Sequence, residues 1–217
     1  MSHPDPGALP LPLDYQPIPF KRSGLLIVIE GVGGSGKSTL AANLAERFEA
    51  QILHTAPAPL RGMQRYVNDH CRALPHLLFY LAGAMHVSDL ARATLEDSAV
   101  IIDRYTGSLQ ANHSAVQGTS IEEAAALIDP FRHYLLTPDV TFYLDAHAAD
   151  VAARTSARRT ANPHTRDPLT DAPLIESIRA RFRQLADYDT TGIRIDTHGK
   201  SPDQISTHAH RLLQDFP

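Results

Sequence analysis

The sequence lacks the features that mark secreted, membrane-spanning or zinc-binding proteins. Cys71 is its only cysteine, so the chain cannot form an intrachain disulfide, and a cysteine-based zinc site is not expected. No run approaches the roughly 18 apolar residues that span a bilayer, and residues 1–20 do not resemble a signal peptide. We therefore expect a protein of the reducing cytoplasm without a membrane partner.

Basic residues are also too few for a protein that coats nucleic acid. The chain has 20 Lys and Arg against 24 Asp and Glu, a formal net charge of −4, whereas phosphate backbones require a basic surface. Nucleic-acid partners are therefore not expected. With 217 residues, 43% of them apolar, the chain can form one medium-sized globular domain.

Prolines are concentrated at the N-terminus. Their spacing interrupts both helices and sheet ladders. They are Pro4, Pro6, Pro10, Pro12, Pro17 and Pro19. We expect residues 1–22 to form an extended or disordered arm and residues 23–217 to form the folded domain.

From residue 24 onward, segments typical of strands alternate with segments typical of helices. Apolar runs predict strands at residues 25–29, 51–54, 99–102, 140–144 and 193–195. Helical spacing predicts helices at 39–50, 75–96, 148–159, 173–188 and 202–214, with one or two more between 109 and 136. This alternation predicts a three-layer α/β domain with about five parallel strands and helices on both faces.

Residues 31–38 match the phosphate-binding signature G-x-x-x-x-G-K-[ST] at every fixed position. A predicted strand precedes them and a predicted helix follows, so backbone N–H groups can surround phosphate oxygens. Lys37 is expected to reach the β- and γ-phosphates of ATP, and the Ser38 hydroxyl to coordinate Mg²⁺. The residues predicted to bind ATP are Gly31, Gly33, Gly34, Ser35, Gly36, Lys37, Ser38 and Thr39.

The tripeptide Asp103-Arg104-Tyr105 directly follows the third predicted strand. An aspartate at that end of a strand, beside the phosphate loop, can hold Mg²⁺ directly or through water. The neighbouring arginine can bind phosphate oxygens in a bidentate manner. The guanine-reading tetrapeptide N-K-x-D of GTPases does not occur in the chain. The pattern favours a kinase of small molecules.

These features resemble the thymidylate kinase family of nucleoside monophosphate kinases. The matching segments are Glu30-Gly31, Leu77-Leu78-Phe79, Asp103-Arg104-Tyr105 with Ser108, the arginine-rich residues 154–167, and Ile195-Asp196-Thr197. On the central helix, Phe79, Tyr80 and Gly83 are similar to the branch that contains the mitochondrial-type UMP-CMP kinase.

The resemblance implies a sheet order of 2-3-1-4-5 and a homodimer. It also implies a mobile, arginine-rich lid at about residues 152–170, in which Arg158 and Arg166 would stabilise the transferred phosphoryl group. The implied catalytic residues are Lys37, Asp103, Arg104, Arg158 and Arg166. The implied substrate-binding residues are His54, Phe79, which would stack on the acceptor base, Tyr80, Arg104, which would hold the acceptor phosphate, Tyr105 and Ser108.

The chain departs from the family pattern on the acceptor side. Thymidylate kinases usually have an aspartate where this chain has Gly33, and Arg-Glu-Pro where residues 54–57 read His-Thr-Ala-Pro. They also have a base-reading arginine where this chain has Gly83, and the glycine would vacate volume. We therefore expect the acceptor to be a pyrimidine-type monophosphate other than dTMP, or a related phosphorylated metabolite.

Two other functions stay open beside phosphorylation of a monophosphate. A monophosphate is already anionic near neutral pH, because its second pKa is about 6, and needs no general base. A hydroxyl acceptor usually needs one, and the related deoxynucleoside kinases keep a glutamate just after the second strand, whereas residues 51–68 contain no Asp or Glu. In a hydroxyl kinase, His54 or Asp103 would serve as the base. The third possibility is an inactive nucleotide-binding module.

Overall fold

The computed structural model describes residues 16–161 and 171–214. Five parallel strands form one sheet in the order β2-β3-β1-β4-β5, which confirms the predicted α/β class and strand order. The strands are β1 (Leu26–Gly31), β2 (Gln51–His54), β3 (Val100–Asp103), β4 (Val140–Asp145) and β5 (Gly192–Asp196).

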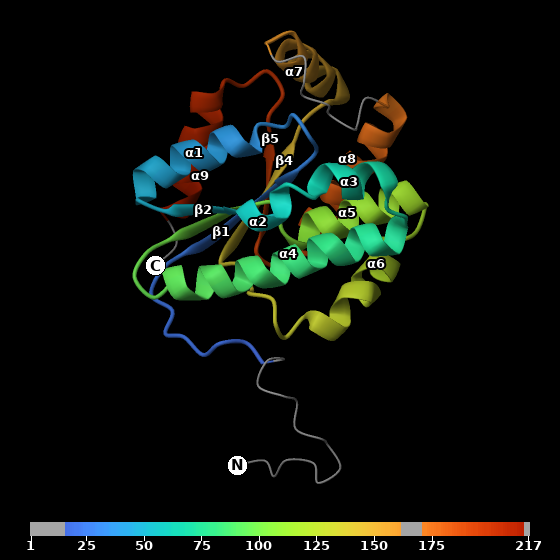
Figure 1. Cartoon of the computed structure of the whole chain (residues 1–217). Coiled ribbons are helices and arrows are strands. Elements are labelled where there is room, and N and C mark those ends of the chain that lie inside the picture. Colours follow the sequence, from blue (N-terminus) through green and yellow to red (C-terminus); the bar gives the residue numbers. More distant parts are fainter. Residues whose placement is uncertain (1–15, 162–170, 215–217) are drawn as a thin grey trace.

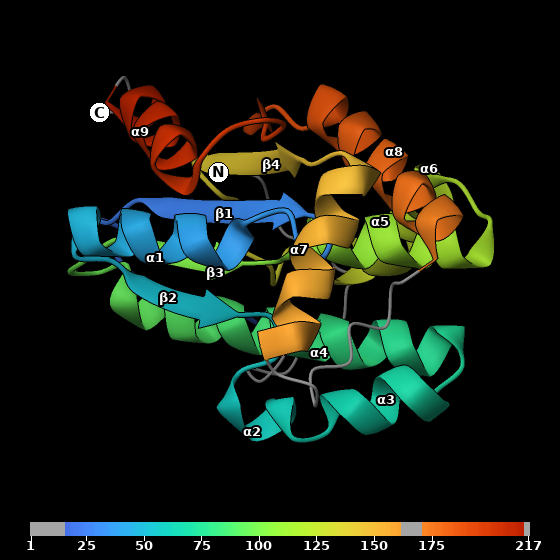
Figure 2. The ribbon, with the colours of Figure 1, turned by 90° about the horizontal axis from the view of Figure 1, so that it is seen from above.

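Helices cover both faces of the sheet, so the fold has three layers (Figures 1 and 2). Ile27 and Ile29 of β1 pack with α1 (Lys37–Phe48) and α9 (Pro202–Leu213). The intervening Leu26 and Val28 point to the opposite face, where they pack with α4 (Ala73–Thr94). The second face also carries α5 (Thr106–Gln117) and α8 (Ala172–Tyr188), with α6 (Ile121–Ile128) and the 3₁₀ helix η2 (Asp129–Phe131) outside α5.

Two short helices, α2 (Ala58–Arg61) and α3 (Gln64–His70), lie between β2 and α4 and were not predicted from the sequence. From the sequence, Pro57 and Pro59 indicated only that the preceding strand ends there. In the structure Pro57 precedes α2 and Pro59 lies in its first turn, where the missing N–H of proline costs nothing. Figure 2 shows both helices beside α4, where they extend the acceptor side of the predicted site.

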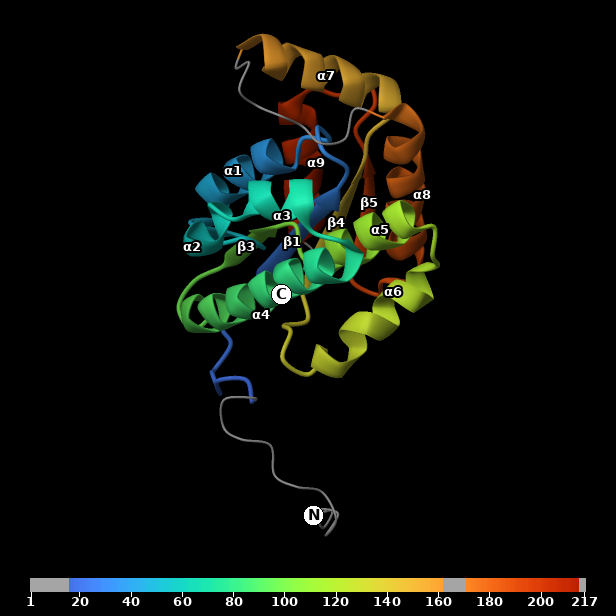
Figure 3. The same cartoon turned by 45° about the vertical axis from the view of Figure 1, so that its right-hand side comes forward.

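The carboxyl ends of the parallel strands meet at one edge of the sheet, which is where ligands bind in open α/β folds. Helix α7 (Ala148–Ala161) crosses above this edge (Figure 3). Its residues 152–161 fall in the segment predicted to be a lid, about 152–170, and residues 162–170 of that segment lie outside the described residues.

The final residues of the proline-rich segment contact the domain. Residues 16–22 form no helix or strand, but Phe20 packs against the core beside α4. Arg22 pairs with Asp139 and donates to the Thr137 carbonyl at 3.1 Å. The rest of the predicted arm, residues 1–15, lies outside the described residues. Within residues 16–161 and 171–214, no helix has both the length and the apolar character needed to cross a membrane.

Candidate active site

The phosphate-binding loop connects β1 to α1 in the geometry that the signature predicts. Gly36, directly before α1, has a φ of 105°, and Gly34 has a φ of 79°, values that favour glycine. The buried Lys37 ammonium donates to the Val32 carbonyl at 2.6 Å and lies 3.4 Å from the Ser35 hydroxyl. Ser38 and Thr39 are exposed in the first turn of α1. The loop, with Gly31 and Gly33, therefore forms a backbone cradle at a helix N-terminus, which is suited to phosphate.

Asp103 lies beside this cradle at the end of β3. Its Oδ2 accepts a hydrogen bond from the Ser38 hydroxyl at 2.7 Å and lies 3.8 Å from Nδ1 of His54. In the described parts of the chain, no cluster of three or more His, Cys, Asp or Glu side chains could hold a metal alone. Two adjoining oxygen donors next to a phosphate cradle nevertheless fit Mg²⁺, which usually takes its remaining ligands from water and phosphate.

Arg104 adopts a backbone conformation that is uncommon for arginine. Its φ is 72°, in the left-handed region. Its Nη1 donates to the Gly31 carbonyl at 3.2 Å and lies 3.4 Å from the Ser108 hydroxyl. The Thr55 hydroxyl donates to the Arg104 carbonyl. These contacts hold the guanidinium against the start of the phosphate loop and tie the Arg104 backbone to the loop after β2.

Two predicted substrate-binding residues, Tyr105 and Ser108, are buried. The Tyr105 side chain is 1% exposed, and its hydroxyl contacts Ser88 and accepts from the Leu136 N–H at 2.9 Å. Burial raises the pKa of this phenol to about 12. The placement of Tyr105 in the substrate site was therefore wrong, because the residue directs its ring into the core. Ser108 is also buried, and its hydroxyl lies 3.4 Å from Nη1 of Arg104.

Sequence reasoning missed the role of Glu30, the penultimate residue of β1. Its side chain is fully buried and accepts from the N–H groups of Tyr105 at 2.8 Å and Ser108 at 3.0 Å. Burial raises the pKa of the Glu30 carboxyl above its usual value, although hydrogen bonds from Ser108 and Tyr105 and the charge of Arg104 oppose the rise. The signal available in the sequence was a charged residue inside an otherwise apolar strand.

The predicted acceptor side contains aromatic side chains of α4. Phe79 and Tyr80 are partly exposed, and their rings meet edge to face with centroids 5.2 Å apart. The Tyr80 hydroxyl donates to Oδ1 of Asn68 at 2.8 Å, which ties α4 to α3. His54, at the end of β2, is also partly exposed.

Gly83 does not create the vacant volume that the sequence suggested. A Cβ on this residue would lie 1.9 Å from the Thr55 carbonyl oxygen and 3.8 Å from the Ala56 Cα. The loop after β2 therefore occupies the space that a side chain on α4 would need. That expectation was wrong, because glycine here permits close backbone packing.

Helix α7, which overlaps the predicted lid, contacts the phosphate loop. Nη1 of Arg154 lies 3.3 Å from the carbonyl oxygens of both Gly34 and Ser35. Gly34 also faces Val151 and Thr155 of α7. Arg158 belongs to α7, but its side chain is outside what the structure describes, and Arg166 lies entirely outside the described residues. Among the arginines of the predicted lid, Arg154 is the one whose described side chain lies beside the cradle.

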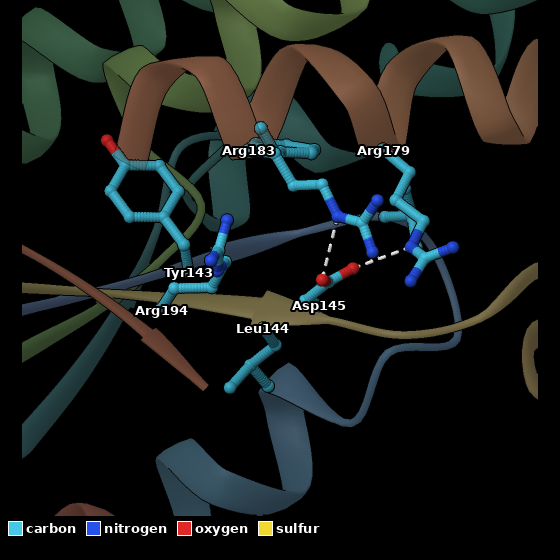
Figure 4. Close-up of a pocket in the computed structure, with 8 residues that line it drawn as sticks. Tyr143, Leu144, Asp145, Arg179, Arg183 and Arg194 are labelled. Carbon is cyan, nitrogen blue, oxygen red and sulfur yellow. Dashed lines mark hydrogen bonds and ion pairs between the residues drawn. The ribbon is translucent and has the colours of Figure 1, made fainter. Parts of the chain in front are cut away.

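A second cluster of charges joins β4 to α8 behind the phosphate loop (Figure 4). Arg179 and Arg183 reach down from α8 and donate to the two carboxylate oxygens of Asp145, at 2.5 and 2.8 Å. Burial opposes ionisation of Asp145, yet the hydrogen bonds from both arginines lower the pKa of its carboxyl. Arg179 also pairs with Glu176 at 3.0 Å, so these ion pairs hold α8 against the end of β4.

Comparison with known proteins identifies the relatives of this arrangement. The sequence model of a family described as "Thymidylate kinase" matches residues 29–208. A thymidylate kinase of Pseudomonas fluorescens is 34% identical over 149 residues, which are 63% of this chain and 70% of that protein. A probable thymidylate kinase of Methanosarcina barkeri is 25% identical over 204 residues, covering 89% of this chain and 97% of that protein.

The fold also matches a solved structure. The thymidylate kinase of Candida albicans superimposes with a TM-score of 0.72 at 21% identity, covering 89% of this chain and 92% of that one. These comparisons support the family resemblance inferred from the sequence. They give no support to the narrower placement in the branch of mitochondrial-type UMP-CMP kinases.

Proposed function

Because the chain belongs to the thymidylate kinase family and is an ATP-dependent nucleoside monophosphate kinase, we propose that it transfers the γ-phosphoryl group of ATP to dTMP. The observation that carries the proposal is the meeting of the phosphate loop, Asp103 and Arg104 at one edge of the sheet. The products would be dTDP and ADP.

Each residue at this edge has a distinct part in the proposed reaction. The backbone N–H groups of residues 31–38 and the Lys37 ammonium bind the phosphates of ATP. Ser38 and Asp103 would hold Mg²⁺, which supplies charge neutralisation on the phosphates. Arg104 binds the acceptor phosphate, and Arg154 stabilises charge on the lid side. A phosphate acceptor is already anionic, so no residue has to remove a proton.

The choice of dTMP replaces the acceptor expected from the sequence. That expectation relied partly on volume vacated at Gly83, and the Thr55 backbone occupies this volume. The departures at Gly33 and residues 54–57 remain, so other pyrimidine monophosphates belong in the test. The Candida albicans thymidylate kinase is described as having broad substrate specificity, which is a further reason to compare acceptors side by side.

The test is a comparison of kcat/KM for dTMP, UMP, CMP and dCMP, with ATP and Mg²⁺ held at saturation. We expect dTMP to have the highest value. A higher value for UMP, CMP or dCMP would overturn dTMP as the acceptor while leaving the kinase assignment intact. The Lys37→Ala protein, purified in the same way, reports any contaminating kinase.

A hydroxyl acceptor is the second candidate, because His54 lies 3.8 Å from the Asp103 carboxylate and could take a proton. Nucleosides in the same assay test it. Phosphorylation of thymidine but of no monophosphate would make His54 the next residue to substitute. A protein that binds ATP and transfers phosphate to none of these acceptors would instead be an inactive nucleotide-binding module.

We also propose that the chain forms the homodimer implied by the family resemblance and works in the cytoplasm. Leu74 and Leu78 are 50% and 44% exposed on successive turns of α4, and can supply apolar contacts between two copies. Sedimentation equilibrium of the full chain tests the dimer. A monomer at tens of micromolar, or an unchanged dimer in a Leu74→Asp, Leu78→Asp variant, would contradict this interface.

A further inference from the structure

Helix α5 begins directly after Tyr105, and the acceptor for its first N–H groups comes from a distant part of the chain. Its N-cap residue, Tyr105, makes no capping hydrogen bond through its own side chain. By contrast, α6 and α9 begin with Ser120 and Ser201, each of which caps its own helix. The free N–H groups at the start of α5 therefore need an acceptor from elsewhere.

Glu30 supplies that acceptor from β1, 75 positions earlier in the chain. Its Oε1 accepts from the N–H groups of Tyr105 and Ser108, and its Oε2 accepts from the Ser108 hydroxyl. Gly107 makes room for the carboxyl group, since a Cβ there would lie 3.0 Å from Oε1 and 3.1 Å from Cδ. A carboxylate at a helix N-terminus is also favoured by the helix dipole.

The capped turn contains Arg104, which binds the acceptor phosphate in the proposed function. Arg104 has a φ of 72° and is followed at once by Tyr105, whose N–H is held by Glu30. Its guanidinium donates to the carbonyl of Gly31, which follows Glu30 in the chain. It also lies near the hydroxyl of Ser108, which donates to Glu30. Loss of the carboxylate would remove the acceptor of the Tyr105 N–H, which follows Arg104 directly, and of the Ser108 hydroxyl, which lies 3.4 Å from the Arg104 guanidinium.

We propose that Glu30 is a positioning residue, which holds the strained β3–α5 turn so that Arg104 faces the acceptor phosphate. The inference rests on the proposed function, in which Arg104 binds that phosphate. Glu30 touches neither substrate and acts through Arg104 alone. A role confined to stability would alter the melting temperature without a selective effect on the acceptor.

A double-mutant cycle on dTMP binding, measured by calorimetry, tests this link. We expect Glu30→Ala to weaken dTMP binding about tenfold and to change ATP binding less than about twofold. In an Arg104→Ala background, Glu30→Ala should cause no further loss. Equal losses in both backgrounds, or unchanged dTMP binding in Glu30→Ala alone, would overturn the proposal.

Two further variants separate positioning from general destabilisation. Glu30→Gln keeps an oxygen that can accept from both N–H groups, so we expect dTMP affinity within about threefold of the wild type. Leu213→Ala, in the buried core on the opposite face of the sheet, should lower stability without a selective loss of dTMP binding. If Glu30→Ala does not fold, Glu30→Asp, which withdraws the carboxylate by one methylene, takes its place in the cycle.

Amide hydrogen exchange tests the same contact without any substrate. We expect peptides covering residues 104–110 to exchange faster in Glu30→Ala than in the wild type, and Leu213→Ala to leave them unchanged. Unchanged exchange in Glu30→Ala would overturn the inference, whatever the acceptor is. A wild-type protein that transfers phosphate to no monophosphate would overturn the proposed function separately.

Discussion

The two sides of the proposed active site are built in different ways. The ATP side is one contiguous segment, residues 31–38, whose geometry follows from the glycines and the adjoining helix N-terminus. The acceptor side is assembled from the loop after β2, helix α4 and the β3–α5 turn, which meet only in the folded chain. The ATP side can therefore be recognised from a short motif, whereas the acceptor side depends on packing between distant segments.

The largest effect is expected on the ATP side. Lys37→Ala should lower kcat about 100- to 1,000-fold, because it removes a charge directed at the phosphates. The melting temperature should stay near that of the wild type. Steady-state ADP release measures the loss, and Lys200→Ala, at an exposed lysine before α9, is the matched control. Comparable turnover by folded Lys37→Ala would contradict the role of this side.

The next largest effect is expected for the ion pairs that Asp145 forms with Arg179 and Arg183 behind the phosphate loop. Asp145→Asn should lower the free energy of unfolding by about 3 kcal/mol at pH 7, since it removes the buried carboxylate that pairs with Arg179 and leaves that arginine only its ion pair with the half-exposed Glu176. Asp129→Asn, which breaks an exposed ion pair with Arg132, should cost less than about 1 kcal/mol. Chemical denaturation measures both variants.

The pH dependence of this effect follows from the lowered pKa of Asp145. The folded state holds the carboxylate ionised to a lower pH than the unfolded state does, so the stabilisation is present above the usual pKa of 3.8 and is lost as the pH falls through the folded value. The gap between wild type and Asp145→Asn should therefore narrow below about pH 4. A gap that widens on acidification would be inconsistent with this sign.

On the acceptor side, Gly83→Ala tests whether the close approach of two backbones shapes the site. We expect a loss of about 2 kcal/mol in stability, because the new Cβ would displace the Thr55 carbonyl. KM for the acceptor should rise more than KM for ATP. Gly62→Ala is the control, since its φ is −61° and a Cβ there meets nothing within 4 Å. Equal stabilities for the two variants would show that the loop after β2 can move enough to accommodate the new Cβ.

The smallest effect is expected for Phe79→Ala. If the ring stacks on the acceptor base, its loss should cost about 1 kcal/mol of acceptor binding and raise that KM roughly fivefold, with KM for ATP unchanged. Partial exposure of Phe79 makes a large loss of stability unexpected. Phe131→Ala, at an exposed ring of η2, is the control. A drop in melting temperature with both KM values unchanged would identify Phe79 as a packing residue only.

Whether an element or a residue's role could be predicted from the sequence depends on the same difference between local and distant contacts. The phosphate loop, the five strands and their helices were predictable, because contiguous apolar runs and a fixed glycine and lysine spacing determine them. Helices α2 and α3 were not, since the same prolines that end a strand can also begin a helix. Tyr105 was misplaced because its sequence position, beside Arg104, does not say which way its ring points.

The sequence by itself determined the order of the secondary structure, the phosphate loop and the resemblance to a kinase family, because each of these depends on residues that are contiguous in the chain. Only the tertiary structure decided what Gly83 and Glu30 do. Gly83 meets the Thr55 backbone, 28 positions away, and Glu30 bonds residues that lie 75 and 78 positions away. The physical reason is that a hydrogen bond or a steric contact depends on where two backbones come together, and no local pattern of residues specifies that distance.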